Sequence, residues 1–246
     1  MHISVIASGS NGNSCLVEDK GASVLIDAGK SAKEIESRLN NLGKSAENID
    51  GIILTHSHID HYIGIGPIAR KYNIPVYLTK ETYSETSDKL GAIQTKHFTL
   101  NKYFKIKGLK IQPILTSHDV QSSGFVINHF GLFTDTGIIT QQMQDVLPSL
   151  KGILLESNHD IDMLINGPYP SFLKQRILSD NGHLSNIHAS SFIQQKSKDL
   201  NFVLLAHLSA NNNTVEKAKH TFETIVKKKI DYSVLSRDKE SGTWEL

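Results

Sequence analysis

The sequence is poor in cysteine, and this limits how it can bind metal or be cross-linked. Cys15 is its only cysteine among 246 residues. No disulfide can therefore form within the chain, and cysteine-only zinc ribbons and Cys-x-x-Cys redox sites are excluded. Any metal must be held by His, Asp or Glu side chains.

Excess charge and long apolar runs are also scarce. The formal net charge is +1 and the sequence pI is about 7.9, which indicates no large nucleic-acid surface, although a local phosphate site needs only a few donors. No uncharged apolar run approaches the roughly 18 to 20 residues that span a bilayer. The N-terminal residues 1–6 lead into a strand-like segment without a signal-peptide pattern. We therefore expect a cytoplasmic protein with no membrane partner.

The overall composition is that of a globular protein. Hydrophobic residues make up 39% of the chain and charged residues 21%, which excludes disordered, collagen-like and coiled-coil classes. A single α/β domain is common at about 200 to 250 residues, and we see no low-complexity linker. We predict one domain over residues 1–246. Histidine is abundant, with 12 residues.

Strand-like and helix-like segments alternate along the chain. Two strand-rich halves, each followed by helices, predict an α/β fold in which two mixed sheets pack face to face with helices outside. The predicted strands cover residues 3–7, 15–17, 23–26, 51–55, 76–78, 104–106, 109–115, 125–128, 132–134, 152–156, 202–206, 232–235 and 243–246, with a turn at 129–131. The predicted helices cover residues 31–42, 63–72, 170–178, 186–198 and 215–228, and one more begins near residue 81.

The densest chemical signal follows the buried strand at 51–55. The segment Thr55-His56-Ser57-His58-Ile59-Asp60-His61 places four metal ligands within six residues. Two imidazoles two residues apart can converge on one ion from a loop, and Asp60 and His61, one turn later, can face a second ion. The alternative is a polar loop with incidental histidines, which does not explain why a buried strand ends in these groups. The segment therefore predicts a metal site.

Three later apolar strands end in further ligands, which are His118, Asp135 and His207. Each one alone is more typical of a surface or turn residue. Together with the first cluster, all of them follow the carboxyl ends of strands. They predict a shared metal cleft at one rim of the sheets.

These residues resemble the metallo-β-lactamase superfamily. The signature His-x-His-x-Asp-His is present in full in residues 56–61, and the later His, Asp and His follow in the same order. The resemblance implies an αββα sandwich. It also points away from antibiotic hydrolysis, because Asp135 stands where lactamases carry a cysteine, and towards glyoxalase II, ribonuclease Z and related hydrolases. The ligands that it implies are His56, His58 and His118 for one ion, Asp60, His61 and His207 for the other, and Asp135 as the bridge.

A narrower resemblance is to the exonuclease-like YycJ/WalJ branch of that superfamily. It is carried by residues 7–14, Thr134-Asp135-Thr136-Gly137, Glu156-Ser157-Asn158-His159-Asp160 and Gly182-His183-Leu184-Ser185-Asn186. The branch implies a 5′-to-3′ exonuclease acting on single-stranded or 5′-phosphorylated DNA. Cyclic phosphodiesterases of phosphonate metabolism look similar around Asn158-His159-Asp160. The chain has no inserted second domain of the ribonuclease J type, which argues against processive handling of long RNA.

The expected chemistry is hydrolysis by two divalent metal ions. An all-His/Asp site accepts Zn²⁺ or Mn²⁺, with Fe²⁺ as a further choice. A water that bridges two such ions has its pKa lowered towards neutrality and becomes a hydroxide nucleophile, which suits phosphodiester cleavage. Asp60 would bind an ion with one oxygen and orient the attacking water with the other.

The segment Gly182-His183-Leu184-Ser185-Asn186 precedes a helical pattern, with Ser185 as the natural N-cap. Helix N-termini bind phosphate, so we predict that Ser185 and Asn186 hold a substrate phosphate. His183 would lie near the scissile bond, where it donates a hydrogen bond or protonates the leaving oxygen. The alternative is an ordinary cap beside a solvated histidine. His159 is a candidate to face the substrate or support a metal ligand, and a structural role is equally open.

The sequence is compatible with three further functions. One is a cyclic or small-molecule phosphodiesterase, another a glyoxalase II-like thioesterase, and the last a metal-binding regulatory module without turnover. The glycine-containing stretch at residues 8–14 permits either a loop near the cleft or a plain hairpin connection. The oligomeric state does not follow from the sequence.

Overall fold

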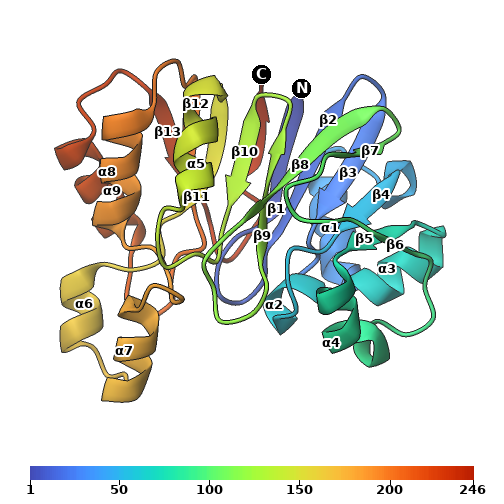
Figure 1. Ribbon diagram of the computed structural model, residues 1–246, viewed down its shortest axis with the longest axis horizontal. Coiled ribbons are helices and arrows are strands. Elements are labelled where there is room, and N and C mark those ends of the chain that lie inside the picture. The colour runs from blue at the N-terminus through green and yellow to red at the C-terminus, as the bar shows by residue number, and fades with distance from the viewer. The chain divides into compact units, whose positions relative to one another are not determined.

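The computed structural model describes residues 1–246 and divides into two units (Figure 1). Unit 1 comprises Met1–Pro113 and Ser236–Leu246, and unit 2 comprises Ile114–Leu235. The two chain ends therefore belong to one unit, where the backbone N–H of Leu246 donates to the carbonyl of Met1 at 2.9 Å. That residues 1–246 form one domain stays a prediction.

The sheet of unit 1 has the strand order β14-β1-β2-β3-β4-β5-β6. The strands from β14 to β3 are antiparallel, and those from β3 to β6 are parallel, so the sheet is mixed. Strands β7 and β8 form an antiparallel hairpin, and the boundary between the units falls within β8. The bounds are β1 His2–Ala7, β2 Ser14–Asp19, β3 Ala22–Ile26, β4 Gly51–Ile53, β5 Val76–Leu78, β6 Thr95–His97, β7 Phe104–Ile106, β8 Leu109–Leu115 and β14 Gly242–Glu245.

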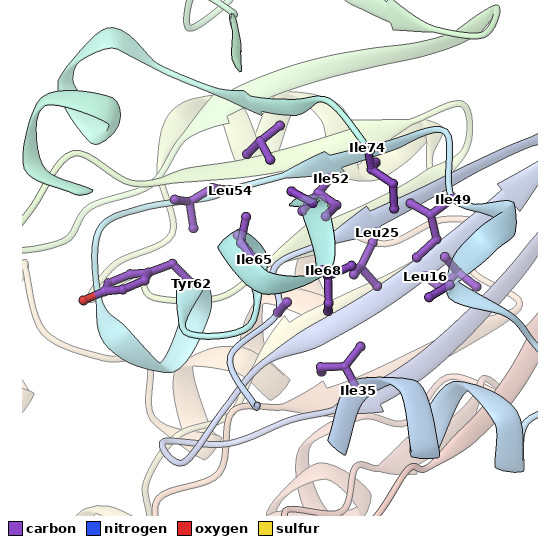
Figure 2. Close-up of a cluster of buried hydrophobic side chains, with 14 of the residues drawn as sticks. Leu16, Leu25, Ile35, Ile49, Ile52, Leu54, Tyr62, Ile65, Ile68 and Ile74 are labelled. Carbon is purple, nitrogen blue, oxygen red and sulfur yellow. The ribbon is translucent and has the colours of Figure 1, made fainter. Parts of the chain in front are cut away.

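Helices cover the sheet of unit 1 through a continuous apolar cluster (Figure 2). Ile35 of α1 and Ile65 and Ile68 of α3 pack with strand residues such as Leu25 and Ile52, and all five are fully buried. Each such side chain contributes roughly 1.5 to 3 kcal/mol relative to an exposed one. The helices of unit 1 are α1 Ala32–Asn41, α2 Ile59–Tyr62, α3 Ile65–Tyr72 and α4 Lys80–Leu90, with a 3₁₀ turn η1 at Ala46–Asn48.

The strands of unit 2 run in the order β13-β12-β11-β10-β9. Strands β10 to β13 are parallel neighbours, and β9 is antiparallel to β10. The carboxyl ends of β10, β11 and β12 therefore lie at one edge of the sheet. The bounds are β9 Ser123–Ile127, β10 Phe130–Phe133, β11 Gly152–Glu156, β12 Phe202–Ala206 and β13 Asp231–Val234.

The helices of unit 2 pack on its sheet through a second apolar cluster. Met143 of α5, Phe192 of α8 and Phe222 of α9 share this cluster with strand residues Phe133 and Leu155. Figure 1 shows α8 and α9 beside one another, with α6 and α7 extending away from them. The bounds are α5 Gln141–Val146, η2 Leu147–Ser149, α6 Ile161–Asn166, α7 Ser171–Leu178, α8 Asn186–Lys196 and α9 Val215–Ile225.

The structure confirms two mixed sheets with helices on them. Strands β5, β7, β8, β11 and β12 have the predicted bounds. The predicted turn at 129–131 is wrong, because Asn128 takes the left-handed conformation that Asn tolerates, with φ of 52°, and β10 already begins at Phe130. A helix also begins earlier than predicted, at Ile59, so that Asp60 and His61 lie in α2.

No helix in the structure is both long enough and apolar enough to cross a membrane.

Candidate metal-binding site

The histidine-rich segment of unit 1 lies at the carboxyl end of β4. His56 follows this fully buried strand and is itself buried, and α2 then carries Asp60 and His61. The ring centroid of His56 is 4.7 Å from that of His58 and 4.1 Å from that of His61. The short loop and the first turn of α2 thus gather three imidazoles in unit 1.

Asp27, which the sequence analysis did not single out, orients these imidazoles. It follows β3, the parallel neighbour of β4. One carboxylate oxygen accepts from His61 Nδ1 at 2.7 Å and from Thr55 Oγ1 at 2.9 Å, and the other accepts from the Thr55 backbone N–H at 2.9 Å. Thr55 Oγ1 in turn accepts from His56 Nδ1 at 2.9 Å. Burial raises the pKa of Asp27, while the charge of His61 and the hydrogen bonds oppose that rise.

Unit 2 gathers a second cluster at the edge where its parallel strands end. Asp135 follows β10, Glu156 ends β11 and His207 follows β12, while His183 precedes α8. One ligand atom from each of the four residues lies within 4.8 Å of those of the others. The side chain of His183 is 21% exposed, against 2% for Asp135 and 0% for Glu156. Of these three side chains, that of His183 is therefore the most open to solvent.

Glu156 organises this cluster, although the sequence motif that contains it gave it no role. Its Oε1 accepts from His183 Nδ1 at 2.7 Å and from His207 Nδ1 at 2.8 Å. Its Oε2 accepts from the backbone N–H of Thr136 at 2.9 Å and of Leu184 at 3.3 Å. Burial raises its pKa, but the charges and hydrogen bonds of the two histidines outweigh burial and lower the pKa to about 2. An acid that ends an apolar buried strand is the signal that could have identified it.

His118 follows β8 and also belongs to unit 2. Its Nδ1 donates to the carbonyl of Gly182 at 3.2 Å, and its Nε2 lies 3.3 Å from Asp119 and 3.9 Å from Asp135. Asp119 also pairs with Arg176 of α7. Burial lowers the pKa of His118, which favours the neutral imidazole that a metal ligand must be.

Ser185 and Asn186 lie at the start of α8 and are buried. Ser185 Oγ accepts from the backbone N–H of His188 at 3.2 Å and so caps the helix, as predicted. Asn186 Oδ1 accepts from Ser157 Oγ at 2.6 Å and from Asn213 Nδ2 at 2.9 Å. Both side chains therefore also have structural partners within unit 2.

His159 is joined to the start of α8 through its backbone. Its carbonyl accepts from the backbone N–H of Asn186 at 2.9 Å. Its side chain is 1% exposed and neither ring nitrogen has a hydrogen-bond partner. Burial lowers its pKa to about 4, so the ring is neutral at physiological pH.

The donor atoms in both units fit divalent cations. In each of four histidines Nδ1 is hydrogen-bonded to an oxygen, which places the ligand lone pair on Nε2. With the carboxylates of Asp60 and Asp135, these nitrogens form an N/O donor set that suits Zn²⁺, Mn²⁺ or Fe²⁺. The Nδ1 partners are Thr55 for His56, Asp27 for His61, Gly182 for His118 and Glu156 for His207.

The predicted site residues thus form two groups, one in each unit. Unit 1 brings together His56, His58, Asp60 and His61. Unit 2 brings together His118, Asp135, His183 and His207, with Ser185 next along the chain from this cluster. That both groups serve one centre stays a prediction.

Comparison with known proteins agrees with this chemistry. The family model described as metallo-beta-lactamase superfamily matches residues 7–147. The chain is 38% identical to exodeoxyribonuclease WalJ of Streptococcus pneumoniae strain D39, over 89% of this chain and 85% of that protein. It is 34% identical to exodeoxyribonuclease YycJ of Bacillus anthracis, over 93% of this chain and 90% of that protein.

A solved structure shows the same fold. The metallo-beta-lactamase fold protein YhfI of Bacillus subtilis aligns with a TM-score of 0.78 and 19% identity, covering 100% of this chain and 98% of that one. The predicted fold class is therefore confirmed. The chain belongs to the metallo-β-lactamase superfamily, in the branch that contains the two exodeoxyribonucleases.

Proposed function

We propose that this chain is a divalent-cation-dependent phosphodiesterase that degrades single-stranded or 5′-phosphorylated DNA as a 5′-to-3′ exonuclease. The observation that carries the proposal is the His183–Glu156 pair, a half-buried imidazole anchored beside Asp135 and His207. Similarity to two exodeoxyribonucleases over most of the chain supports the choice of DNA. A cytoplasmic location also stays a prediction.

The proposed centre holds two divalent cations, Zn²⁺ or Mn²⁺, with Fe²⁺ as the further choice. Cations bound there would lower the pKa of a water nucleophile and neutralise charge that develops on the phosphoryl group. The support for this centre is the arrangement of imidazole nitrogens and carboxylates in each unit. The ligands are assigned as predicted, with His56, His58 and His118 for one cation, Asp60, His61 and His207 for the other, and Asp135 shared.

Two residues of the chain would handle protons. Asp60, whose side chain is 21% exposed, orients the attacking water and accepts its proton. His183 uses Nδ1 to donate to Glu156, so its Nε2 faces the substrate, where it hydrogen-bonds or protonates the leaving oxygen. The ionised carboxylate of Glu156 holds the ring in that orientation. His159, three residues after Glu156, is assigned to the support of this region.

Ser185 and Asn186 are proposed to place a substrate phosphate at the N-terminus of α8. Because Ser185 Oγ already caps the helix, Ser185→Ala separates the two roles. A residue that only caps loses about 1 kcal/mol of stability, whereas a phosphate holder also loses kcat/KM on 5′-phosphorylated DNA. The measurement is thermal unfolding alongside initial rates on 5′-phosphorylated and 5′-hydroxyl strands, with Ser191→Ala later in the same helix as the control.

Degradation of single-stranded DNA by the purified protein in Mn²⁺ tests the main proposal. We expect the 5′-phosphorylated strand to be shortened from its 5′ end and the 5′-hydroxyl strand to be degraded more slowly. His58→Ala should be inactive on both, which excludes a contaminating nuclease. If DNA stays intact with wild-type protein in both Mn²⁺ and Zn²⁺, the proposal is contradicted.

Other substrates in the same assay cover the remaining alternatives. Hydrolysis of a cyclic nucleotide or of bis(p-nitrophenyl) phosphate without DNA cleavage would assign a small-diester phosphodiesterase. Hydrolysis of S-lactoylglutathione would assign a thioesterase. Cation binding without turnover of any of these would indicate a regulatory module.

A further inference from the structure

The loop between β1 and β2 packs directly against the metal-ligand segment of unit 1. The backbone N–H of Asn13 donates to the carbonyl of Asp60 at 2.8 Å, and the N–H of Gly29 donates to the carbonyl of Asn13 at 2.8 Å. A Cβ at Gly29 would lie only 1.7 Å from the Asp60 carbonyl oxygen and 2.5 Å from the Asn13 nitrogen. The loop is therefore more than a hairpin connection, since its backbone is pinned to α2.

The side chain of Asn13 has one orientation that satisfies its surroundings. Oδ1 accepts a hydrogen bond from the backbone N–H of Gly9 at 3.0 Å, and only the oxygen of the carboxamide can accept such a bond. Nδ2 consequently faces the ligand segment, 3.1 Å from His61 Nε2 and 3.4 Å from Asp60 Oδ2. The last two atoms are 3.6 Å apart, so the three polar atoms form a small triangle.

The tautomer of His61 decides which atom donates. His61 Nδ1 lies 2.7 Å from a carboxylate oxygen of Asp27, so Nδ1 carries the hydrogen and Nε2 carries the lone pair. Asn13 Nδ2 can then donate one hydrogen bond to His61 and one to Asp60. Asn13 is 6% exposed, so these bonds are formed away from bulk water.

We propose that Asn13 is a positioning residue for the cation ligands Asp60 and His61. Its carboxamide holds the two side chains together in the cation-free protein. When a divalent cation binds, the hydrogen bond from Asn13 Nδ2 to His61 Nε2 breaks, and the lone pair of Nε2 becomes available to the cation. The N–H directed at Asp60 is retained, which keeps the carboxylate oriented both for cation binding and for orienting the attacking water. This inference rests on the proposed metal centre, and it assigns a role to the loop at residues 8–14.

Cation binding by purified protein, without DNA, tests the proposal. Wild type, Asn13→Ala and Asn11→Ala are stripped with EDTA and titrated with Zn²⁺ in competition with a chromophoric chelator. We expect Asn13→Ala to lose about tenfold in affinity for at least one Zn²⁺, because the lost orientation of Asp60 outweighs the release of the His61 lone pair, and tenfold is the usual effect of removing a partner that orients a ligand. Asn11, an exposed residue of the same loop, should have no effect when replaced. Equal affinity of Asn13→Ala and wild type overturns the proposal.

A second variant separates positioning from loop folding. Asn13→Asp keeps an oxygen for the Gly9 N–H but replaces the donor that faces His61 and Asp60 with an acceptor. We expect its thermal midpoint to fall in EDTA, because two carboxylates then face each other, and to recover most of the loss in excess Zn²⁺. A midpoint that falls equally with and without Zn²⁺ would mean that Asn13 serves only the loop, and would overturn the proposal.

Nuclear magnetic resonance gives a direct readout of the displaced hydrogen bond. The side-chain amide signals of Asn13, assigned by their absence in Asn13→Ala, should shift when Zn²⁺ is added, together with the Nε2 signal of His61. If His61 Nε2 shifts while the Asn13 amide stays unchanged, the proposal fails. If wild-type protein binds no Zn²⁺ at all, the proposed metal centre itself fails, so the two failures are distinguishable.

Discussion

Glu156 shows how much one buried carboxylate can organise. Four hydrogen bonds converge on it, two from histidine side chains and two from backbone N–H groups. Donors to an ionised group give shorter and stronger hydrogen bonds than donors to a neutral one. The charge of Glu156 therefore fixes the Nδ1 tautomer and ring orientation of both His183 and His207.

The Glu156→Gln variant removes this charge and keeps the shape. The amide can accept with only one of its two polar atoms, so one pair of donors loses its acceptor. We expect a loss of about 10- to 100-fold in cation affinity, as is usual when the partner of a ligand histidine is changed. Chelator competition with Zn²⁺ measures this, and Glu85→Gln on the exposed side of α4 is the control. Unchanged affinity would show that Glu156 does not support His207.

The low pKa of Glu156 also predicts how stability depends on pH. Because its pKa falls from 4.5 to about 2 on folding, the carboxylate contributes stability that is fully present above pH 4.5 and is lost as pH falls towards 2. Urea unfolding of cation-free protein between pH 5 and 3 should lose free energy more steeply for wild type than for Glu156→Gln. Glu85→Gln should follow wild type. Parallel curves for all three proteins would contradict the assignment.

Neighbouring parallel strands bring the histidine and carboxylate side chains together in each unit. In unit 1, Asp27 follows β3, and the segment that leads to His56 follows β4. In unit 2, Asp135 follows β10, Glu156 ends β11 and His207 follows β12. The shared direction of the strands brings groups that are distant in sequence to one edge, where the loops are free to carry function.

The close approach at Gly29 allows a test of how tightly the unit 1 loops are packed. Gly29→Ala would force the Asp60 carbonyl and the Asn13 loop apart, so we expect a destabilisation of several kcal/mol, the order reached by overpacking against backbone. Weaker Zn²⁺ binding should accompany it. Thermal unfolding and chelator competition measure both effects. Gly43→Asn is the matched control, because Gly43 has φ of 69° in open space and Asn tolerates that conformation. A variant as stable as wild type would refute the tight packing.

At the scale of the whole molecule, the only thiol of the chain reports on unfolding. Cys15 lies in β2, is 3% exposed and pairs in register with Val5 and Ile26. Burial, with the nearby charge of Asp27, raises its pKa far above the ordinary value, and a thiol in that state reacts slowly.

We expect native protein to react with a disulfide reagent such as DTNB at pH 8 at least about a thousandfold more slowly than unfolded protein, because β2 must open first. Protein in denaturant should release one equivalent of thionitrobenzoate at once. Adding Zn²⁺ should slow the native reaction further if the cation binds only folded protein. Rapid modification under native conditions would show that the sheet of unit 1 is not closed around Cys15.

The types of candidate ligand, their positions after apolar strands and the two mixed sheets all follow from the amino-acid sequence alone. These features are local. Alternation of apolar and polar residues, short apolar runs and a dense histidine motif can be recognised without knowing which strands are neighbours. The metal assignments, the phosphate role of Ser185 and the single domain stay predictions. The start of α2 at Ile59 does not follow from the sequence, because His58 at its N-cap makes no side-chain capping hydrogen bond.

The partners of those candidate ligands, in contrast, follow from the three-dimensional fold. Asp27 lies beside His61 because β3 pairs with β4, and Glu156 lies between His183 and His207 because β11 pairs with β12. Asn13 reaches Asp60 because a glycine at 29 leaves room for two backbones to touch. Each contact joins residues that are distant in sequence, and its geometry depends on strand pairing and close packing, which no local pattern of residues encodes.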